Sequence, residues 1–175
     1  MISIIVISFL LIQSFAQTNT ICGDSTESCS WTFDTETNTL IITGNGQMSN
    51  FASEEDVPWK EHFETIENIQ INDGITTIGN FAFMNIKKIT TITIPQSVTT
   101  IGINPFVGCE LLNNVVFTSS TKYSFSNGLV IENNKLISYL TSKEDKDLII
   151  PNSITTIGSY AINKNKYLET ITMKL

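Results

Sequence analysis

The chain contains 175 residues, enough for one domain with a short appendage. Seventeen acidic residues against ten lysines give a net charge of −7, and arginine does not occur. Because arginine is the usual residue for bidentate contacts to phosphate and guanine, this composition argues against a protein that binds nucleic acid. One histidine (His62) and three cysteines also argue against a histidine-rich metal site, so we expect no metal or cofactor. The composition favours a binding or structural protein over an enzyme.

Residues 1–16 predict export. The run Ile2–Ile12 is apolar and uncharged, but it is too short to span a bilayer, which needs about 20 residues. Ser14-Phe15-Ala16 supplies the small-x-small pattern of a signal-peptidase site, although no basic residue precedes the run. The alternative is a buried strand or helix of the fold. We predict cleavage after Ala16, a secreted or cell-surface location, and no membrane insertion of the mature chain.

Export changes how the cysteines are interpreted, because an oxidising compartment permits disulfides. Cys22 and Cys29 lie seven residues apart on either side of a polar loop, so they are candidates for a disulfide that closes it. Cys109 lies within a repeated apolar pattern, and we expect it to be a buried core thiol. Nothing in the sequence places it near His62, so we expect no catalytic pair and no enzyme activity.

Residues 17–65 predict an N-terminal cap. Two β-prone runs, Ser30–Phe33 and Leu40–Thr43, flank Asp34–Asn38 and indicate a hairpin. A short helix is expected to begin at Pro58, because apolar residues follow it at helical spacing. The segment is strongly acidic, and a cap of this kind would shield the open end of a stack of repeats.

A repeat of 23 residues dominates the rest of the chain. The sequence GITTIG at 74–79 recurs as SVTTIG at 97–102 and as SITTIG at 153–158, the last after an insertion of about 33 residues. Each unit begins with apolar residues at positions one, four and six, the L-x-x-L-x-L strand of a leucine-rich repeat. Proline follows two of these strands, Pro95 and Pro151, and stops the ladder because it has no N–H. The units must stack into a solenoid with one continuous core, since none can bury its apolar face alone.

The unit IPQSVTTIG at 94–102, followed by Phe106, Cys109 and Leu112, resembles the BspA-like leucine-rich repeats. These repeats, the Treponema pallidum type of about 23 residues, occur in surface proteins of mucosal bacteria and parasitic protists. The resemblance covers about residues 21–175. It implies a β-rich leucine-rich repeat solenoid with one parallel strand per repeat on a concave face.

The predicted domain organisation follows from the repeat boundaries. Residues 1–16 form the signal peptide, 17–65 the N-terminal cap and 66–175 the leucine-rich repeat domain. The insertion, at about 120–147, alternates around Asn133-Asn134 and predicts an inserted β-hairpin that projects from the solenoid.

The candidate binding surface is the concave face, made by the outward positions of the repeated strands. The site residues predicted there are Asn68, Gln70, Thr91, Thr93, Asn114, Val116, Thr170 and Thr172, with Ile149 at a further outward position. They are mostly uncharged and suit contact with a protein or glycan through hydrogen bonds. The alternative is that threonine and asparagine merely fill exposed strand positions.

The resemblance implies a surface recognition protein, an adhesin or surface antigen that binds a host extracellular matrix-type protein or glycan. Two other functions remain open: a structural or immunogenic coat component without a ligand, and an ice-binding solenoid. The paired threonines of Thr91-x-Thr93 and Thr170-x-Thr172 favour the latter, but the ladder breaks at Asn114 and Val116. The strand Ile171–Leu175 has no cap after it, which indicates either a longer repeat array or self-association through this edge.

Overall fold

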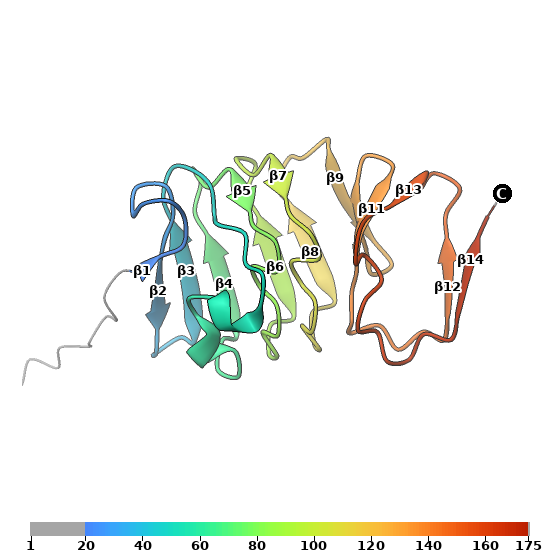
Figure 1. Ribbon diagram of the computed structural model, residues 1–175, viewed down its shortest axis with the longest axis horizontal. Helices are drawn as coiled ribbons and strands as arrows, with labels where there is room; N and C mark the ends of the chain where they lie inside the picture. The colour runs from blue at the N-terminus through green and yellow to red at the C-terminus, as the bar shows by residue number, and fades with distance from the viewer. Residues whose placement is uncertain (1–19, 175) are drawn as a thin grey trace, which may run out of the picture.

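The computed structural model describes residues 20–174, so the predicted signal peptide lies outside the described part of the chain. The chain winds as successive coils stacked along one long axis, with the N-terminal strands at one end and strands β12 and β14 at the other (Figure 1). The stacked-coil architecture predicted from the repeats is confirmed. Among the described residues, no helix is long and apolar enough to cross a membrane.

The N-terminal cap is an antiparallel sheet that continues directly into the solenoid. Its strands are β1 (Thr20–Ile21), β2 (Ser30–Asp34) and β3 (Thr39–Thr43). The predicted hairpin is confirmed, because β2 and β3 pair antiparallel from Asp34↔Thr39 onward. Strand β4 (Asn68–Ile71) then pairs parallel with β3. The first repeat strand therefore grows on the edge of the cap.

The helix expected from Pro58 is shorter than the sequence spacing suggested. The structure has two 3-10 turns, η1 (Glu54–Asp56) and η2 (Lys60–His62). The backbone N–H groups of residues 67 and 68 both donate to the carbonyl oxygen of Asn38, so the ladder between β3 and β4 begins at this point. Because the strand ladder begins so soon after Pro58, the helical segment that follows this proline is a single turn. Trp59 and Phe63, on either side of this turn, are both buried.

The 23-residue repeat corresponds to one coil. Strands β6 (Thr91–Ile94) and β8 (Asn114–Phe117) pair parallel, and the short strands β5 (Thr77–Ile78) and β7 (Thr100–Ile101) pair on another side of the coil. Both registers join residues that are 23 apart, such as Thr91↔Asn114. Most isoleucines of the L-x-x-L-x-L pattern are buried as predicted, among them Ile66, Ile71, Ile89, Ile92 and Ile94, whereas Ile69 is only partly buried. The Phe83 ring of one coil stacks on the Phe106 ring of the next, with 6.3 Å between the ring centroids.

The insertion supplies three strands of a four-stranded sheet rather than a lone hairpin. Its strands are antiparallel neighbours: β9 (Tyr123–Ser126), β10 (Leu129–Glu132) and β11 (Lys135–Tyr139). The two-residue turn at Asn133-Asn134 is confirmed. The expectation that the insertion projects from the solenoid is wrong. Strand β11 pairs parallel with β13 (Thr156–Ile157), and the Tyr123 hydroxyl bonds to the backbone of the preceding coil.

We call β9, β10 and β11 the septum sheet, because its two faces belong to different cores. Val130 and Ile137 pack in the core that contains the cap and the first coils. Leu129 and Leu136 pack in a second core with residues of the last coils. The expected single continuous core is therefore divided in two. Consecutive apolar residues are typical of strands that are buried on both faces, and that property is visible in the sequence LVI at 129–131.

The last coils contain β12 (Asp147–Ile150) and β14 (Thr170–Met173), which pair parallel. Ile171 and Met173 stand opposite Leu148 and Ile150 in this ladder and are about half exposed. Self-association through this edge stays a prediction, and size-exclusion chromatography of the chain measures it directly. A monomer at all concentrations would contradict the pairing.

The cap is also closed by a disulfide between Cys22 and Cys29, whose Cα atoms are 5.0 Å apart. Replacing both cysteines by serine is expected to lower the free energy of unfolding by about 2–3 kcal/mol, because the unfolded chain regains the freedom of the short loop. Urea unfolding of the two proteins measures this difference. Reductant should weaken the parent chain alone; equal weakening of the double variant would contradict the assignment.

Candidate functional site

The predicted binding residues lie on exposed strand positions, in two separate groups. The first group lies on β4, β6 and β8 and consists of Asn68, Gln70, Thr91, Thr93, Asn114 and Val116. We call this exposed surface the strand face. Thr91 lies beside Asn114, and Thr93 beside Val116, through the β6–β8 register. The face is therefore a surface of short, mostly uncharged side chains held on rigid strands.

The second group is separated from the strand face by the septum sheet (Figure 1). Thr170 and Thr172 lie on β14, where Thr172 stands opposite the exposed Ile149. The Thr170 hydroxyl donates a hydrogen bond to a carboxylate oxygen of Asp147. The structure thus divides the predicted concave surface into two patches.

The strand face is interrupted between β4 and β6. Strand β4 belongs to the sheet of the cap and β6 to a sheet with β8, and no ladder joins the two within residues 20–174. The residues one repeat before and after Pro95 are Asn72 and Thr118, and each donates its N–H to the preceding strand over 3.0 Å. Pro95 has no N–H to donate. Pro151 occupies the same position after β12, which likewise has no ladder to the strand before it.

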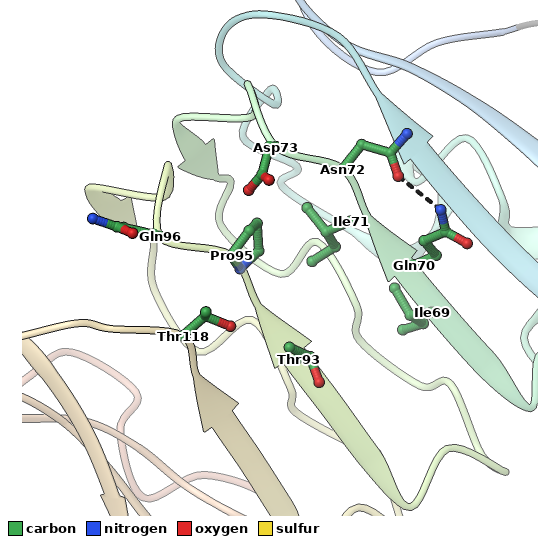
Figure 2. A pocket seen from close by; sticks show the side chains of 9 residues that line it. All are labelled: Ile69, Gln70, Ile71, Asn72, Asp73, Thr93, Pro95, Gln96 and Thr118. Carbon is green, nitrogen blue, oxygen red and sulfur yellow. Dashed lines mark hydrogen bonds between the residues drawn. The ribbon is translucent and has the colours of Figure 1, made fainter.

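An open groove of about 750 Å³ lies at this interruption, and we call it the strand-end groove. Figure 2 shows the side chains that surround it, which come from the ends of β4 and β6 and from the loops that follow β4, β6 and β8. Its lining residues are Ile69, Gln70, Ile71, Asn72, Asp73, Thr93, Pro95, Gln96 and Thr118. Gln70 Nε2 donates to Asn72 Oδ1 over 2.9 Å, which fixes the two amides relative to each other.

The groove brings together two of the predicted residues, Gln70 and Thr93. Sequence reasoning missed Asn72, Gln96 and Thr118, which directly follow or lie just beyond the strand ends rather than on outward strand positions. Pro95 is the sequence signal that could have pointed to them, because a proline at the end of a strand predicts that the hydrogen-bond ladder is interrupted there.

The groove carries little charge. Among its nine described lining residues, Asp73 is the one ionisable group, and no lysine or histidine lines it. Its chemistry is therefore that of amides, hydroxyls and one carboxylate above an apolar floor. Such a set binds ligands by hydrogen bonding and shape rather than by charge attraction.

The histidine and the free cysteine lie elsewhere. His62 is in the cap, stacked on Phe33 with ring centroids 4.1 Å apart, and burial lowers its pKa. Cys109 is fully buried, as predicted, and its thiol donates to the carbonyl oxygen of Phe83 over 2.9 Å. Burial raises the pKa of Cys109 to about 12. The thiol is therefore protonated at neutral pH and is a poor nucleophile.

Cys109 is expected to resist iodoacetamide at pH 8 in the folded protein and to react once the chain is unfolded, because the reactive species is the thiolate. Mass spectrometry of alkylated samples, with and without denaturant, measures this. In the folded chain the Cys109 thiol keeps its proton, whereas in the unfolded chain it loses the proton above its ordinary pKa of 9.0. Stability should therefore fall as the pH rises from about 9 toward 12. Equal alkylation of both states would contradict the burial.

These features define a class of protein. A parallel strand in each coil, a period of 23 residues and a row of inward isoleucines make this a leucine-rich repeat solenoid. Residues 61–146 match the family described as BspA type leucine rich repeat region (6 copies). Residues 61–146 are therefore a BspA-type leucine-rich repeat region.

Three solved structures resemble this chain. They are the pneumococcal vaccine antigen PcpA (21% identity, TM-score 0.56, 73% of this chain covered), a leucine-rich repeat protein from Eubacterium ventriosum (20%, 0.43, 83%) and a leucine rich cell surface protein from Faecalibacterium prausnitzii (24%, 0.49, 62%). The chain spans 33%, 57% and 36% of these proteins, respectively. The likeness to PcpA supports the fold. A search of curated proteins finds no match.

Proposed function

We propose that this chain is a secreted or cell-surface recognition protein, an adhesin or surface antigen that binds a host extracellular protein or glycan through its strand face. The observation that carries the proposal is the row of exposed hydrogen-bonding side chains on β4, β6 and β8, on rigid neighbouring strands. Repeat solenoids present extended surfaces of this kind to their ligands. PcpA, which shares the fold, is named as a vaccine antigen.

Binding is a better match to this surface than catalysis. The strand face has no histidine or cysteine on its six named positions, and Cys109 is held as a buried thiol. Export, which residues 1–16 predict, would bring the face into contact with host material. The competing function is a coat component that has no specific ligand.

The test is binding of the purified chain to immobilised matrix proteins, such as fibronectin and fibrinogen, and to matrix glycans. Thr93→Lys and Gln70→Lys should each reduce retention at least tenfold, because a long charged side chain would obstruct the face. Thr155→Lys makes a matched control, since Thr155 is exposed but lies outside the strand face. Retention that is absent, or that all three variants leave unchanged, would support the coat component instead.

A further inference from the structure

We propose that the strand-end groove is a binding site for a neutral saccharide chain. This inference rests on the proposed function and narrows its ligand to one chemical class. The groove is the place where the strand face gains depth, because the interrupted ladder at Pro95 opens a volume of about 750 Å³. That volume lies within the range of about 300–1,000 Å³ that is typical of small-molecule sites.

The polar lining matches the hydroxyl groups of a sugar. Gln70, Asn72 and Gln96 are amides, each of which carries both donors and an acceptor, and a sugar hydroxyl also donates and accepts. The Gln70–Asn72 hydrogen bond uses one donor and one acceptor of the pair. The side-chain oxygen Oε1 of Gln70 and the side-chain Nδ2 group of Asn72 have no hydrogen-bond partner among residues 20–174. Both groups are therefore available to a ligand.

Two hydroxyls and a carboxylate complete the polar set. Thr93 lies on β6 and Thr118 directly follows β8, so the two hydroxyls come from neighbouring coils. Within residues 20–174, neither hydroxyl is engaged by another side chain or by the backbone. Asp73 adds a strong acceptor to the lining of the groove. Hydrogen-bonding groups thus come from three successive coils, spaced along a chain-like ligand.

The floor of the groove is apolar. Ile69 and Ile71 line it from β4 and Pro95 from the end of β6, and Ile71 is only 9% exposed. A pyranose ring has an apolar face of C–H groups beside its hydroxyls, and such a face packs on aliphatic carbon. An apolar floor with a few fixed polar groups is the usual design of small-ligand sites.

The charge of the groove selects among saccharides. Its one ionisable side chain, among the described lining residues, is the acidic Asp73, and the whole chain carries a net charge of −7. Sulfated or sialylated chains would be repelled and would find no lysine to pair with. Neutral hexose and N-acetylhexosamine chains meet no such penalty.

A protein ligand fits this groove less well. Protein interfaces depend on a few buried anchors, usually tryptophan, tyrosine or arginine. None of these residue types lines the groove, so a protein ligand would have to supply every such anchor itself. Protein binding is therefore an outcome that the experiment must detect rather than the expectation.

The experiment measures binding of the full chain to a printed panel of oligosaccharides. The neutral members are oligomers of glucose, galactose and N-acetylglucosamine, and the anionic members are heparin and sialylated oligosaccharides. We expect a neutral member to bind and the anionic members not to bind. The double variant Gln70→Ala/Asn72→Ala should weaken that binding at least tenfold, and Gln96→Ala should weaken it severalfold.

The matched control is Thr155→Ala/Thr156→Ala, which removes two exposed polar side chains that lie outside the strand face and the strand-end groove. It should leave binding unchanged, and thermal unfolding should show that all variants remain folded. Preferential binding of heparin, or neutral binding that the groove variants leave intact, would overturn the inference. Retention on immobilised matrix proteins without any saccharide binding would overturn it too, while leaving the proposed function standing. Loss of both would count against both.

Discussion

Replacing Gly79 by alanine is expected to lower the free energy of unfolding by about 3 kcal/mol or more, at the upper end of the effect of overpacking. A Cβ at this position would lie 1.7 Å from the carbonyl oxygen of Ser49. The obstacle is backbone, so no side-chain rotation relieves it. The cap segment that carries Ser49 and the coil that carries Gly79 would have to move apart, and their packing would be lost.

The repeat supplies matched controls for this prediction. Gly102 and Gly158 occupy the equivalent place in later repeats, where the nearest backbone atoms to an added Cβ are 2.5 Å and 2.9 Å away. The loss of stability should therefore decrease in the order Gly79→Ala, Gly102→Ala, Gly158→Ala. Urea unfolding followed by tryptophan fluorescence measures the series. Equal losses would show that the glycines matter for backbone freedom rather than for close approach.

The second large effect is expected from Trp59→Ala, which should cost about 3–5 kcal/mol of stability. Trp59 is fully buried and joins the cap to the first coil. Its ring contacts Trp31 and Phe51 in edge-on geometry and stacks on Phe83, with centroids between 5.8 and 6.0 Å apart. Removing it leaves a cavity at the junction. Hydrogen exchange should therefore accelerate in β4 as well as in the cap.

Two further variants separate ring packing from other effects. Trp59→Phe keeps an aromatic ring and removes an indole N–H that has no hydrogen-bond partner in the described structure. It should cost much less than the alanine variant. Leu111→Ala, at a side chain that is 53% exposed, should change stability by no more than about 0.5 kcal/mol. A loss from Trp59→Phe as large as from Trp59→Ala would contradict the packing argument.

The repeating part of the fold could be predicted from the sequence because its determinants are local and periodic. Ile92 and Val115 occupy the same place in successive units, and a 23-residue offset in the sequence becomes one ladder step in space. The hairpin between β2 and β3 was predictable for a similar reason, since its turn and both strands lie within a few residues.

The septum sheet was only partly predictable. The turn at Asn133-Asn134 is a local signal, but which residues pack on each face of the sheet depends on the rest of the chain. Leu136 and Ile137 are neighbours in sequence and lie in different cores. No pattern within the insertion specifies which partners these residues find, because the partners belong to coils on either side.

The candidate site could likewise be predicted only in part. Gln70 and Thr93 were predictable as outward strand residues, yet nothing in their own strands places them on one groove. They meet at the interruption between β4 and β6, where Pro95 has no N–H to donate, and such an interruption appears only where two strands from different repeats lie side by side. The loop residues Asn72 and Gln96 become part of the site through the same interruption.

The septum sheet also determines how damage spreads through the molecule. Repeat proteins hold together mainly through contacts between neighbours, so fraying at one end ordinarily runs inward coil by coil. Here Val130 and Ile137 pack in the larger core while Leu129 and Leu136 pack in the smaller one, so we expect the larger core to stay closed when the smaller one opens. A protease that cleaves the last coils is therefore not expected to reach the larger core. The strand face on β4, β6 and β8 is therefore expected to stay folded after such cleavage.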